Sequence, residues 1–433
     1  MTQDAASGDG LPARAAAQAI LGEVLRRRRP LDAAQDSVLS AARLDPRDAG
    51  FARAIAGETL RRFGQLDALL KTFIAKPLAP HRSGPTLEIL LAGACELLFL
   101  EVAAHAAVDA ANRLAAHDSR AVHFKPLINA TLRRIAREGR DVLNTLDERL
   151  AAPDWLWTRW RDAFGEDIAR AIVRGHLAKP PVDIAGKDTA FELPGARRLP
   201  NGMLRLADPG RIEDLPGYAD GSWWVQDFAA SLPAHLLGDV RGRTVIDLCA
   251  APGGKTAQLA ARGANVIAVE REAARIARLR GNLERLKLEA TIVEADVLDY
   301  RPDAPAPFVL LDAPCSATGT IRRHPDLPWI KSAADVNLCA AGAGELLDAS
   351  AAMVAPGGTL VFAVCSLEPE EGAEQIAAFL DARSDFARAP LAGSDVFGMR
   401  ELLTAEGDLR TLPCHLADQG GMDGFYAARL RKV

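Results

Sequence analysis

The sequence has few aromatic residues and no cysteines in a zinc-binding pattern. Phe, Trp and Tyr make up 5% of the 433 residues while 49% are hydrophobic, so the core must be built mainly from aliphatic side chains. None of the six cysteines forms a C-x-x-C pair or stands at zinc-ligand spacing from a histidine. We therefore expect no metal site.

Long apolar runs are also missing. No uncharged run approaches the roughly 20 residues that a membrane-spanning helix needs, and residues 1–10 lack a basic stretch followed by an apolar one. We expect neither a membrane span nor a signal peptide. The prediction is a cytoplasmic monomer whose thiols stay reduced and available for chemistry.

Charge is unevenly distributed along the chain, although the net charge is only −5. Residues 11–140 carry 20 Lys and Arg against 13 Asp and Glu, a net charge of +7, and the rest of the chain carries −12. This asymmetry favours a polyanionic partner for the basic part, although a solvated, Arg-rich helix face would give the same count. A phosphate-binding face could be formed by Arg26–Arg29, Arg133, Arg134 and Arg137.

Sequence patterns divide the chain into segments, which we expect to be a disordered tail (1–10), a helical domain (11–143), a linking α+β subdomain (144–235) and an α/β domain (236–433). Apolar residues at three- and four-residue spacing predict the helices, with a central, nearly all-apolar helix around residues 87–98. Proline and glycine punctuate the linking subdomain, in which we predict one helix over Trp155–His176.

The last segment alternates short apolar runs with helical stretches, which is typical of a doubly wound parallel sheet. The predicted strands are Thr244–Leu248, Asn265–Val269, Ala290–Val293, Phe308–Leu311 and Thr359–Val364. Two later runs, around 410–415 and 424–429, are joined by Gly420-Gly421 and predict a C-terminal antiparallel hairpin.

The loop after the first of these strands predicts a cofactor site. It reads Cys249-Ala250-Ala251-Pro252-Gly253-Gly254-Lys255 and opens a helix, so a ligand could approach its backbone N–H groups closely. The loop has neither Walker A nor dinucleotide glycine spacing. S-adenosylmethionine is favoured, because Glu270 ends the second strand and could accept both ribose hydroxyls. Asp296 follows the third strand and could meet the adenine amino group. Glu270 alone could equally be a solvated charge at a helix start.

Two cysteines follow neighbouring strands at the same edge of the predicted sheet. Cys315 stands in the run Asp312-Ala313-Pro314-Cys315, and Cys365 directly follows Val364. Because the carboxyl ends of parallel strands line one crevice, both thiols should face the cofactor site. One such cysteine would be interpreted as a small apolar packing residue, but two cysteines beside a cofactor loop indicate that a thiol takes part in the reaction.

A thiol is useful for methylating a pyrimidine. Carbon 5 of cytosine is a poor nucleophile, but a thiolate that adds to carbon 6 turns the ring into an enamine that can attack a methyl group on sulfur. Lys255 could supply the positive field that favours a thiolate, and the base must be flipped or single-stranded. Position alone does not say which cysteine is the nucleophile.

At these motifs the sequence resembles the NOL/NOP/Sun family of RNA 5-methylcytosine methyltransferases. The resemblance rests on CAAPGGK at 249–255, DAPCSATGT at 312–320 and CSLEPEE at 365–371. It implies that Cys365 is the nucleophile and that Cys315 assists product release. It also implies that the loop 249–255, Glu270, Asp296 and Asp312 contact the cofactor, with Asp312 also meeting the amino edge of the cytosine. Val364 and Ala317 depart from the commoner Thr and Gly.

The helical half shows a second resemblance. Arg14 with its Ala-rich helix, residues 98–108 and residues 128–134 look like a NusB-type RNA-binding domain. Fused to this catalytic half, that domain gives the arrangement of RsmB-type 16S ribosomal RNA methyltransferases, which implies RNA as the partner and 16S rRNA as the substrate. Transfer RNA is an alternative substrate, and an inert NusB-like RNA-binding or assembly factor is an alternative function.

Other reactive or aromatic residues have simpler interpretations. We expect Cys95 and Cys339 to be packing residues and the adjacent Cys414 and His415 to be structural. Trp329 could stack on a base, but burial against the sheet is favoured.

Overall fold

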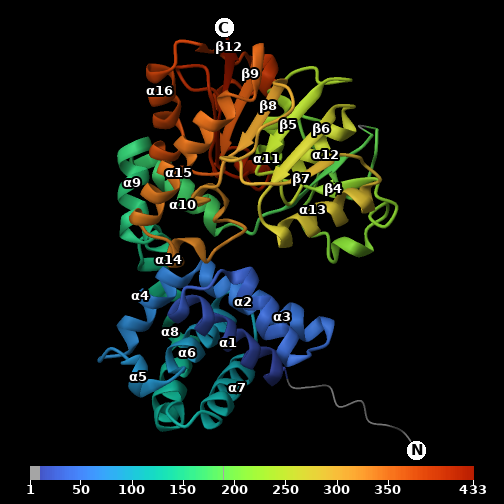
Figure 1. The fold of residues 1–433 in the computed structure, drawn as a ribbon. Coiled ribbons are helices and arrows are strands. Elements are labelled where there is room, and N and C mark those ends of the chain that lie inside the picture. The colour runs from blue at the N-terminus through green and yellow to red at the C-terminus, as the bar shows by residue number, and fades with distance from the viewer. Residues whose placement is uncertain (1–9, 189) are drawn as a thin grey trace, which may run out of the picture. The chain divides into compact units, whose positions relative to one another are not determined.

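The computed structural model describes residues 10–188 and 190–433, which form two compact units. The first unit extends to Asp162 and also contains Arg323–Lys331, and the second comprises Ala163–Arg322 and Ser332–Val433 (Figure 1). The tail predicted over residues 1–10 lies, apart from Gly10, outside the described residues. The boundaries predicted at residues 143 and 235 stay predictions. Within the described part of the chain, no helix combines the length and the apolar character needed to cross a bilayer.

The first unit is helical, as the periodicity predicted. Its helices are α1 (Leu11–Arg27), α2 (Leu31–Ala42), α3 (Pro46–Arg61), α4 (Phe63–Phe73), α5 (Pro80–Ser83), α6 (Thr86–Leu98), α7 (Ala104–Ala116), α8 (Lys125–Thr145) and most of α9 (Asp154–Phe164). Eleven of the 13 residues of α6 are buried, which confirms its central position. The carboxylate of Glu96 on this helix is compensated by Arg14 at 2.7 Å, so Arg14 holds α1 to α6.

A segment that follows the Cys315 motif in sequence packs with the first unit. It contains α14 (Leu327–Ile330). Trp329 donates its indole N–H to the carbonyl oxygen of Leu60 at 3.0 Å, and its ring meets Phe63 edge to face. Leu31 N–H donates to Asp326 Oδ2 at 2.9 Å. The prediction that Trp329 is buried against the sheet is therefore wrong, because residues 323–331 find their apolar partners on the helices.

The single helix predicted over 155–176 is two helices, α9 and α10 (Glu166–Leu177). Gly165 separates them with φ 82° and ψ 162°, a backbone conformation that favours glycine and ends the helical hydrogen-bonding pattern. A four-stranded antiparallel sheet follows, in the order β2 (Arg197–Arg198), β3 (Leu204–Leu206), β1 (Val182–Gly186) and β4 (Trp223–Val225). The linking segment is thus α+β, as predicted.

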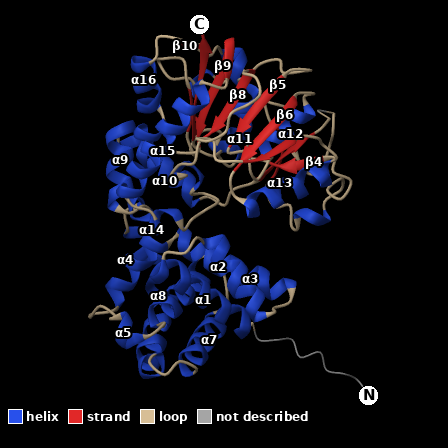
Figure 2. Ribbon diagram, viewed as in Figure 1, coloured by secondary structure: helices blue, strands red, loops and turns tan. Residues whose placement is uncertain are grey.

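The second unit contains the large mixed sheet (Figure 2). Its strands run in the order β10 (Phe386–Arg388), β12 (Phe425–Lys432), β9 (Val354–Val364), β8 (Ala306–Asp312), β5 (Thr244–Leu248), β6 (Asn265–Glu270) and β7 (Thr291–Glu294). The five strands from β9 to β7 are parallel. β12 pairs antiparallel with both β9 and β11 (Leu409–Thr411), which confirms the predicted C-terminal hairpin.

Helices cover both faces of this sheet. They are α11 (Phe228–His235), α12 (Gly254–Ala261), α13 (Ala273–Leu286), α15 (Ala333–Ala351) and α16 (Ala373–Ala382). Successive strand residues feed two separate apolar clusters: Leu310 belongs to one, and Val309 and Leu311 belong to the other. Burial on both faces explains why the strand sequences are continuously apolar. Polar functional groups are therefore expected at the strand ends.

Candidate active site

The loop between β5 and α12 brings backbone N–H groups to the carboxyl edge of the sheet. Gly253 precedes α12 with φ 103°, and a Cβ there would lie 2.5 Å from a methyl carbon of Leu279. Glu270, at the end of β6, accepts hydrogen bonds from the N–H groups of Arg271 at 3.0 Å and Glu272 at 3.2 Å, and from that of Ala251 at 3.4 Å. The first turn after β6 therefore fixes the Glu270 carboxylate against the loop.

A cavity of about 310 Å³ opens beside this loop. Of the predicted cofactor residues, Cys249, Glu270 and Asp296 line it. Ala250, Ala251, Pro252, Gly253, Gly254, Lys255 and Asp312 do not line it, although Pro314, two residues beyond Asp312, does. Sequence reasoning missed several lining residues: Arg271, Arg275, Leu298, Leu338 and Gly342. Cys339, which was expected to be a packing residue, also lines the cavity.

The cavity combines fixed carboxylates with exposed apolar side chains. Asp296 accepts a hydrogen bond from Leu298 N–H at 3.0 Å and pairs with Arg271 at 3.1 Å, and these two contacts hold the pKa of Asp296 below its usual value. Leu338 and Leu298 leave 75% and 40% of their surface exposed there. Acceptors for hydroxyl and amino groups beside apolar walls fit the ribose and adenine of a nucleoside-bearing cofactor.

The two motif cysteines meet where β8 and β9 end. In this parallel pair Asp312 lies opposite Ala363, so the residues that follow each strand leave the sheet side by side. Cys315 Sγ and Cys365 Sγ lie 3.4 Å apart, and both residues are partly exposed. The hydrogen bond with Cys365, and then burial, raise the pKa of the Cys315 thiol well above its usual value. Either sulfur could be the donor in this contact, and the raised pKa favours the proton on Cys315.

Lys255 connects the cofactor loop to the cysteines. Its Nζ lies 2.6 Å from Asp312 Oδ2 and above the ring of Phe425. Burial alone would lower the pKa of Lys255, but the charge of Asp312 and the hydrogen bond to it outweigh burial and raise the pKa. Cys365 also contributes to this increase, so the ammonium lies within electrostatic reach of its sulfur. The raised pKa of Lys255 therefore favours a positive charge within electrostatic reach of Cys365.

Close backbone packing fixes the loop that carries Cys315. Gly319 N–H donates to the carbonyl oxygen of Cys365 at 3.0 Å, and Gly424 N–H donates to that of Gly319 at 2.8 Å. A Cβ on Gly319 would lie 1.9 Å from the oxygen of Gly424, so only glycine fits. The Cys315 loop is thus held between the ends of β9 and β12.

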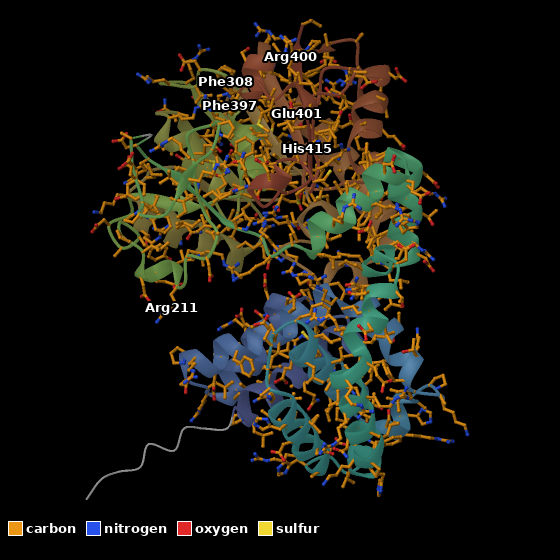
Figure 3. All side chains as sticks on the ribbon, turned by 180° about the vertical axis from the view of Figure 1, so that it is seen from behind. Arg211, Phe308, Phe397, Arg400, Glu401 and His415 are labelled. Atoms are coloured by element: carbon orange, nitrogen blue, oxygen red, sulfur yellow. The ribbon has the colours of Figure 1, made fainter. Side chains whose placement is uncertain are left out.

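The remaining cysteines have other surroundings. Burial raises the pKa of Cys95 and of Cys249 to about 12, with the charges of Asp312 and Glu270 adding to the effect at Cys249. His415, marked in Figure 3, accepts a hydrogen bond at Nδ1 from Leu412 N–H at 3.1 Å, within the same turn as Cys414. Burial raises the pKa of Cys414 as well, so Cys95, Cys249 and Cys414 lie in settings that disfavour a thiolate.

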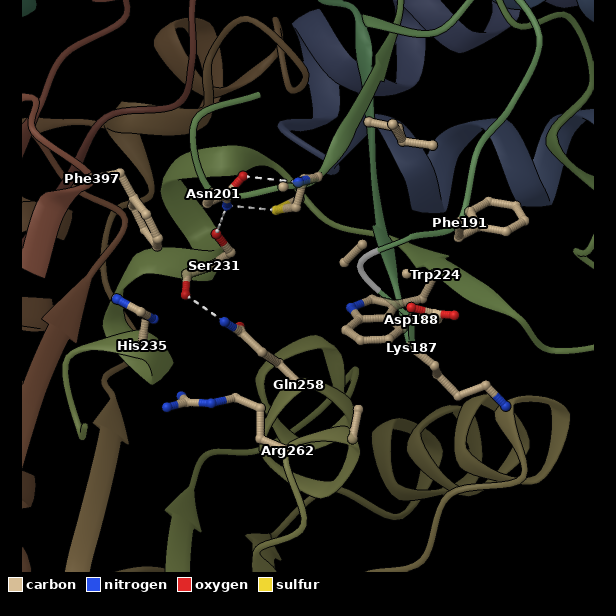
Figure 4. Close-up of a pocket in the computed structure, with 16 residues that line it drawn as sticks. Lys187, Asp188, Phe191, Asn201, Trp224, Ser231, His235, Gln258, Arg262 and Phe397 are labelled. Carbon is tan, nitrogen blue, oxygen red and sulfur yellow. Dashed lines mark hydrogen bonds between the residues drawn. The ribbon is translucent and has the colours of Figure 1, made fainter. Parts of the chain in front are cut away.

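A second cavity, of about 280 Å³, lies elsewhere in the same unit (Figure 4). Trp224, Phe191 and Phe397 line it together with polar side chains, of which Asn201 donates to Ser231 Oγ at 3.0 Å. Its lining includes none of the residues predicted from the motifs. Of the predicted site residues, Cys249, Glu270 and Asp296 line the cavity beside β6, whereas Cys315 and Cys365 line neither cavity.

Comparison with known proteins agrees with this arrangement. Residues 234–431 match the family model described as 16S rRNA methyltransferase RsmB/F, and residues 11–137 match the NusB family. The chain is 36% identical to the ribosomal RNA small subunit methyltransferase B of Pseudomonas putida, covering 97% of this chain and 98% of that protein. It is 34% identical to the Vibrio cholerae protein of the same name, covering 97% of both.

Solved structures share the fold. A methyltransferase homologue from Pyrococcus horikoshii is 26% identical, covers 67% of this chain and 99% of its own, and has a TM-score of 0.55. NSun6 from the same organism, solved with SFG, has a TM-score of 0.55 at 18% identity and covers 65% of this chain and 98% of its own. The protein is an enzyme that uses S-adenosylmethionine, and RNA is its partner. The chain belongs to the RsmB/F family of rRNA methyltransferases, with a NusB-family region preceding the catalytic unit.

Proposed function

We propose that this enzyme transfers a methyl group to carbon 5 of a cytosine in 16S rRNA, through a covalent bond between Cys365 and carbon 6. The observation that carries the proposal is the 3.4 Å contact between Cys315 Sγ and Cys365 Sγ at adjoining strand ends. A methyl transfer to a ribose or to an exocyclic nitrogen has no use for two touching thiols. S-adenosylmethionine supplies the electrophilic methyl group.

Cys365 acts first, as a thiolate that adds to carbon 6. The electron pair of the C5–C6 double bond becomes available at carbon 5 and would form the bond to the methyl group, while the bond from that methyl group to the cofactor's sulfur would break and leave its electron pair on the sulfur. Lys255 stabilises the thiolate through its charge, and Asp312 keeps the ammonium in place at 2.6 Å. Asp312 also lies at the end of β8, where it can accept a hydrogen bond from the cytosine amino group.

Cys315 acts in the second half of the reaction. Once carbon 5 carries the methyl group, its proton passes to solvent water and the electron pair of that C–H bond re-forms the C5–C6 double bond. The C6–S bond then breaks, with its electron pair returning to Cys365 Sγ. The raised pKa of Cys315 keeps it protonated while Cys365 attacks. Its proton can then be donated to the departing sulfur, so the 3.4 Å spacing supports its role in product release.

Cofactor binding is assigned to the cavity beside β6. We propose that Glu270 accepts the ribose hydroxyls and that Asp296 meets the adenine amino group. The backbone of residues 249–255, of which Cys249 lines the cavity, would hold the methionine portion. The exposed side chains of Leu298 and Leu338 are available to cover the two faces of the adenine ring. These residues line or adjoin one cavity, which supports a single binding site for the cofactor.

The helical unit is assigned to RNA binding. Arg27 and Arg29 both pair with Glu23, and Arg134 and Arg137 both pair with Glu138. Exposed pairs of this kind contribute little to stability, so phosphate oxygens can replace the carboxylates at small cost. We propose that the protein acts as a cytoplasmic monomer.

The proposal is tested with the purified protein, S-adenosylmethionine carrying a deuterated methyl group, and small-subunit RNA from a strain lacking the enzyme. Nucleoside mass spectrometry should find the label in 5-methylcytidine. Label in another nucleoside would refute the proposed position, and absence of label would favour the inert RNA-binding factor. Bisulfite sequencing of the deletion strain should find the unmodified cytosine in 16S rRNA, whereas a loss confined to transfer RNA would identify that substrate instead.

A further inference from the structure

The two loops that carry the cysteines are joined by a buried polar cluster directly after each sulfur-bearing residue. Its members, here called the hydroxyl–carboxylate cluster, are Ser316, Thr318, Ser366 and Glu371. Each has at most 1% of its surface exposed. Two of them are sequence neighbours of Cys315 and Cys365, so any shift within the cluster moves a sulfur atom.

Glu371 contacts the Cys315 loop through both of its carboxylate oxygens. It lies in the short 3₁₀ turn Pro369–Glu371 that follows the Cys365 motif. Its Oε1 accepts from Ser316 N–H at 2.7 Å, and its Oε2 accepts from Ser316 Oγ at 2.6 Å. The part of the chain that the structure describes offers Glu371 no ion pair with a lysine or arginine. Burying a carboxylate without an ion pair costs free energy unless it is hydrogen-bonded, and here the hydrogen bonds come from Ser316.

The hydroxyl protons of the cluster can all point towards Glu371. Leu367 N–H donates to Thr318 Oγ1, and Glu368 N–H donates to Ser366 Oγ, both at 3.0 Å, so both oxygens are already acceptors. Thr318 can then donate to Ser366, and Ser366 can donate to Ser316, each across 3.3 Å. Ser316 Oγ donates its hydrogen bond to Glu371, so this series of hydrogen bonds ends at a carboxylate, which accepts hydrogen bonds and donates none.

We propose that Glu371 is a positioning residue that sets the spacing of Cys315 and Cys365 by holding Ser316 and, through it, Ser366. The reaction needs one sulfur at carbon 6 and the other within proton-transfer distance of it. The catalytic benefit of this spacing rests on the proposed function, but the effect of Glu371 on the two cysteines can be tested without RNA. Glu371 itself does not touch the substrate.

The charge of Glu371 has a second effect, on the division of roles between the two thiols. The groups that face Cys315 are Cys365, Glu371 and the backbone N–H of Ala317. The hydrogen bond with Cys365 and burial come first in raising the pKa of Cys315, and the negative charge of Glu371 adds to them. Burial raises the pKa of Glu371 above its usual value, the hydrogen bonds from Ser316 and Ser366 oppose this increase, and the charge of Glu368 adds to it. The presence of Glu371 therefore favours Cys315 as the protonated partner.

The experiment compares Glu371→Gln and Glu371→Ala with the wild-type protein. Free protein is treated briefly with iodoacetamide between pH 6 and 9, and peptide mass spectrometry gives the alkylation ratio of Cys365 to Cys315. The wild-type ratio should favour Cys365, and in Glu371→Ala it should fall several-fold, because loss of the negative charge lowers the pKa of the Cys315 thiol and makes it more reactive. Glu371→Gln keeps an acceptor for Ser316 N–H but removes the charge, so it should lie between the two.

Activity gives the second readout. In single-turnover methylation, Glu371→Ala should lower the rate constant at least about tenfold, while the Kd for S-adenosylmethionine stays unchanged. Glu374→Gln is the matched control, because Glu374 is exposed at the start of α16 and should leave both readouts at wild-type values. If Glu371→Gln and Glu371→Ala both keep the wild-type alkylation ratio and rate, the inference is refuted. A wild-type protein that transfers no methyl group would refute the proposed function instead, and the alkylation ratio would still decide the role of Glu371.

Discussion

Cys315 Sγ and Cys365 Sγ lie 3.4 Å apart, although fifty residues separate them in the chain. The parallel pairing of β8 with β9 brings them together, and Glu371 and Gly319 fix the loops that follow. In the proposed mechanism the two sulfurs have different roles, because a proton shared between them resides on one of them at a time. The predictions below follow from this arrangement and from the charges around it.

The first prediction separates the roles of the two thiols. Cys315→Ala should form the covalent RNA adduct but fail to resolve it, because the proton donor for the departing sulfur is gone. A denaturing gel should then show a retarded protein–RNA band, and Cys365→Ala should show none. Both variants remove one sulfur from the same contact, so each controls for local packing changes in the other. A retarded band with Cys365→Ala alone would reverse the assignment.

The second prediction concerns the pair Lys255 and Asp312. A double-mutant cycle with Lys255→Met and Asp312→Asn should give a coupling energy of about 1–2 kcal/mol in the free energy of unfolding, because the ammonium is mostly buried. Lys71 and Asp67 form a matched control with the same 2.6 Å separation on the exposed surface of α4. Their coupling should be only about 0.3–0.5 kcal/mol. Equal couplings would show that burial adds nothing to the Lys255 pair.

The third prediction is a pH dependence of stability caused by Asp247. Its carboxyl is 1% exposed, and burial raises its pKa from 3.8 to about 7, although Thr256 donates to it at 2.6 Å. The folded protein therefore holds a proton that the unfolded chain has lost. The stabilisation from this proton is complete below about pH 4 and disappears as the pH rises to about 7.

Asp247→Asn removes this titration. Urea denaturation should show that the stability of the wild-type protein relative to Asp247→Asn falls with increasing pH across this window, by up to about 1.4 kcal/mol per pH unit. Two parallel stability curves between pH 4 and 7 would mean that Asp247 is already ionised in the folded protein.

The fourth prediction uses two helical glycines whose Cβ positions are open. Gly342 in α15 and Gly281 in α13 each have no atom within 4 Å of an added Cβ, so alanine should raise the free energy of unfolding by about 1 kcal/mol at either site. Of the two, only Gly342 lines the cavity beside Glu270, which we propose as the cofactor site. Isothermal titration should therefore find weaker S-adenosylmethionine binding for Gly342→Ala and unchanged binding for Gly281→Ala. Equal affinities of the two variants for S-adenosylmethionine would show that the cofactor does not bind against α15.

Much of the catalytic unit could be predicted because its strands are buried on both faces. β5 begins and ends at the predicted residues, and the meeting of Cys315 with Cys365 follows from the rule that parallel strands end at one edge of the sheet. The roles of the two cysteines could not be predicted this way, because their place at a strand end does not say which thiol is deprotonated. Family resemblance supplied the roles of the two cysteines.

Three features of the structure could not be predicted from the sequence: the break between two helices, the packing of one tryptophan and the burial of one carboxylate. Gly165 divides α9 from α10, but an isolated glycine is tolerated within many helices, so its φ of 82° has no local signal. Trp329 follows a catalytic motif but packs on Leu60 and Phe63. Glu371 lies in an acidic run that reads as a solvated turn, and only the fold shows that its carboxylate accepts two hydrogen bonds from Ser316.

The most direct test of the account is the identity of the residue that bonds to the base. An RNA substrate carrying 5-fluorocytosine at the target position cannot lose a proton from carbon 5, so the covalent complex persists after methyl transfer. Proteolysis, nuclease digestion and tandem mass spectrometry of this complex should find the modified nucleotide on the peptide that contains Cys365. A nucleotide attached to Cys315, or no covalent complex despite methyl transfer to cytosine, would contradict the mechanism.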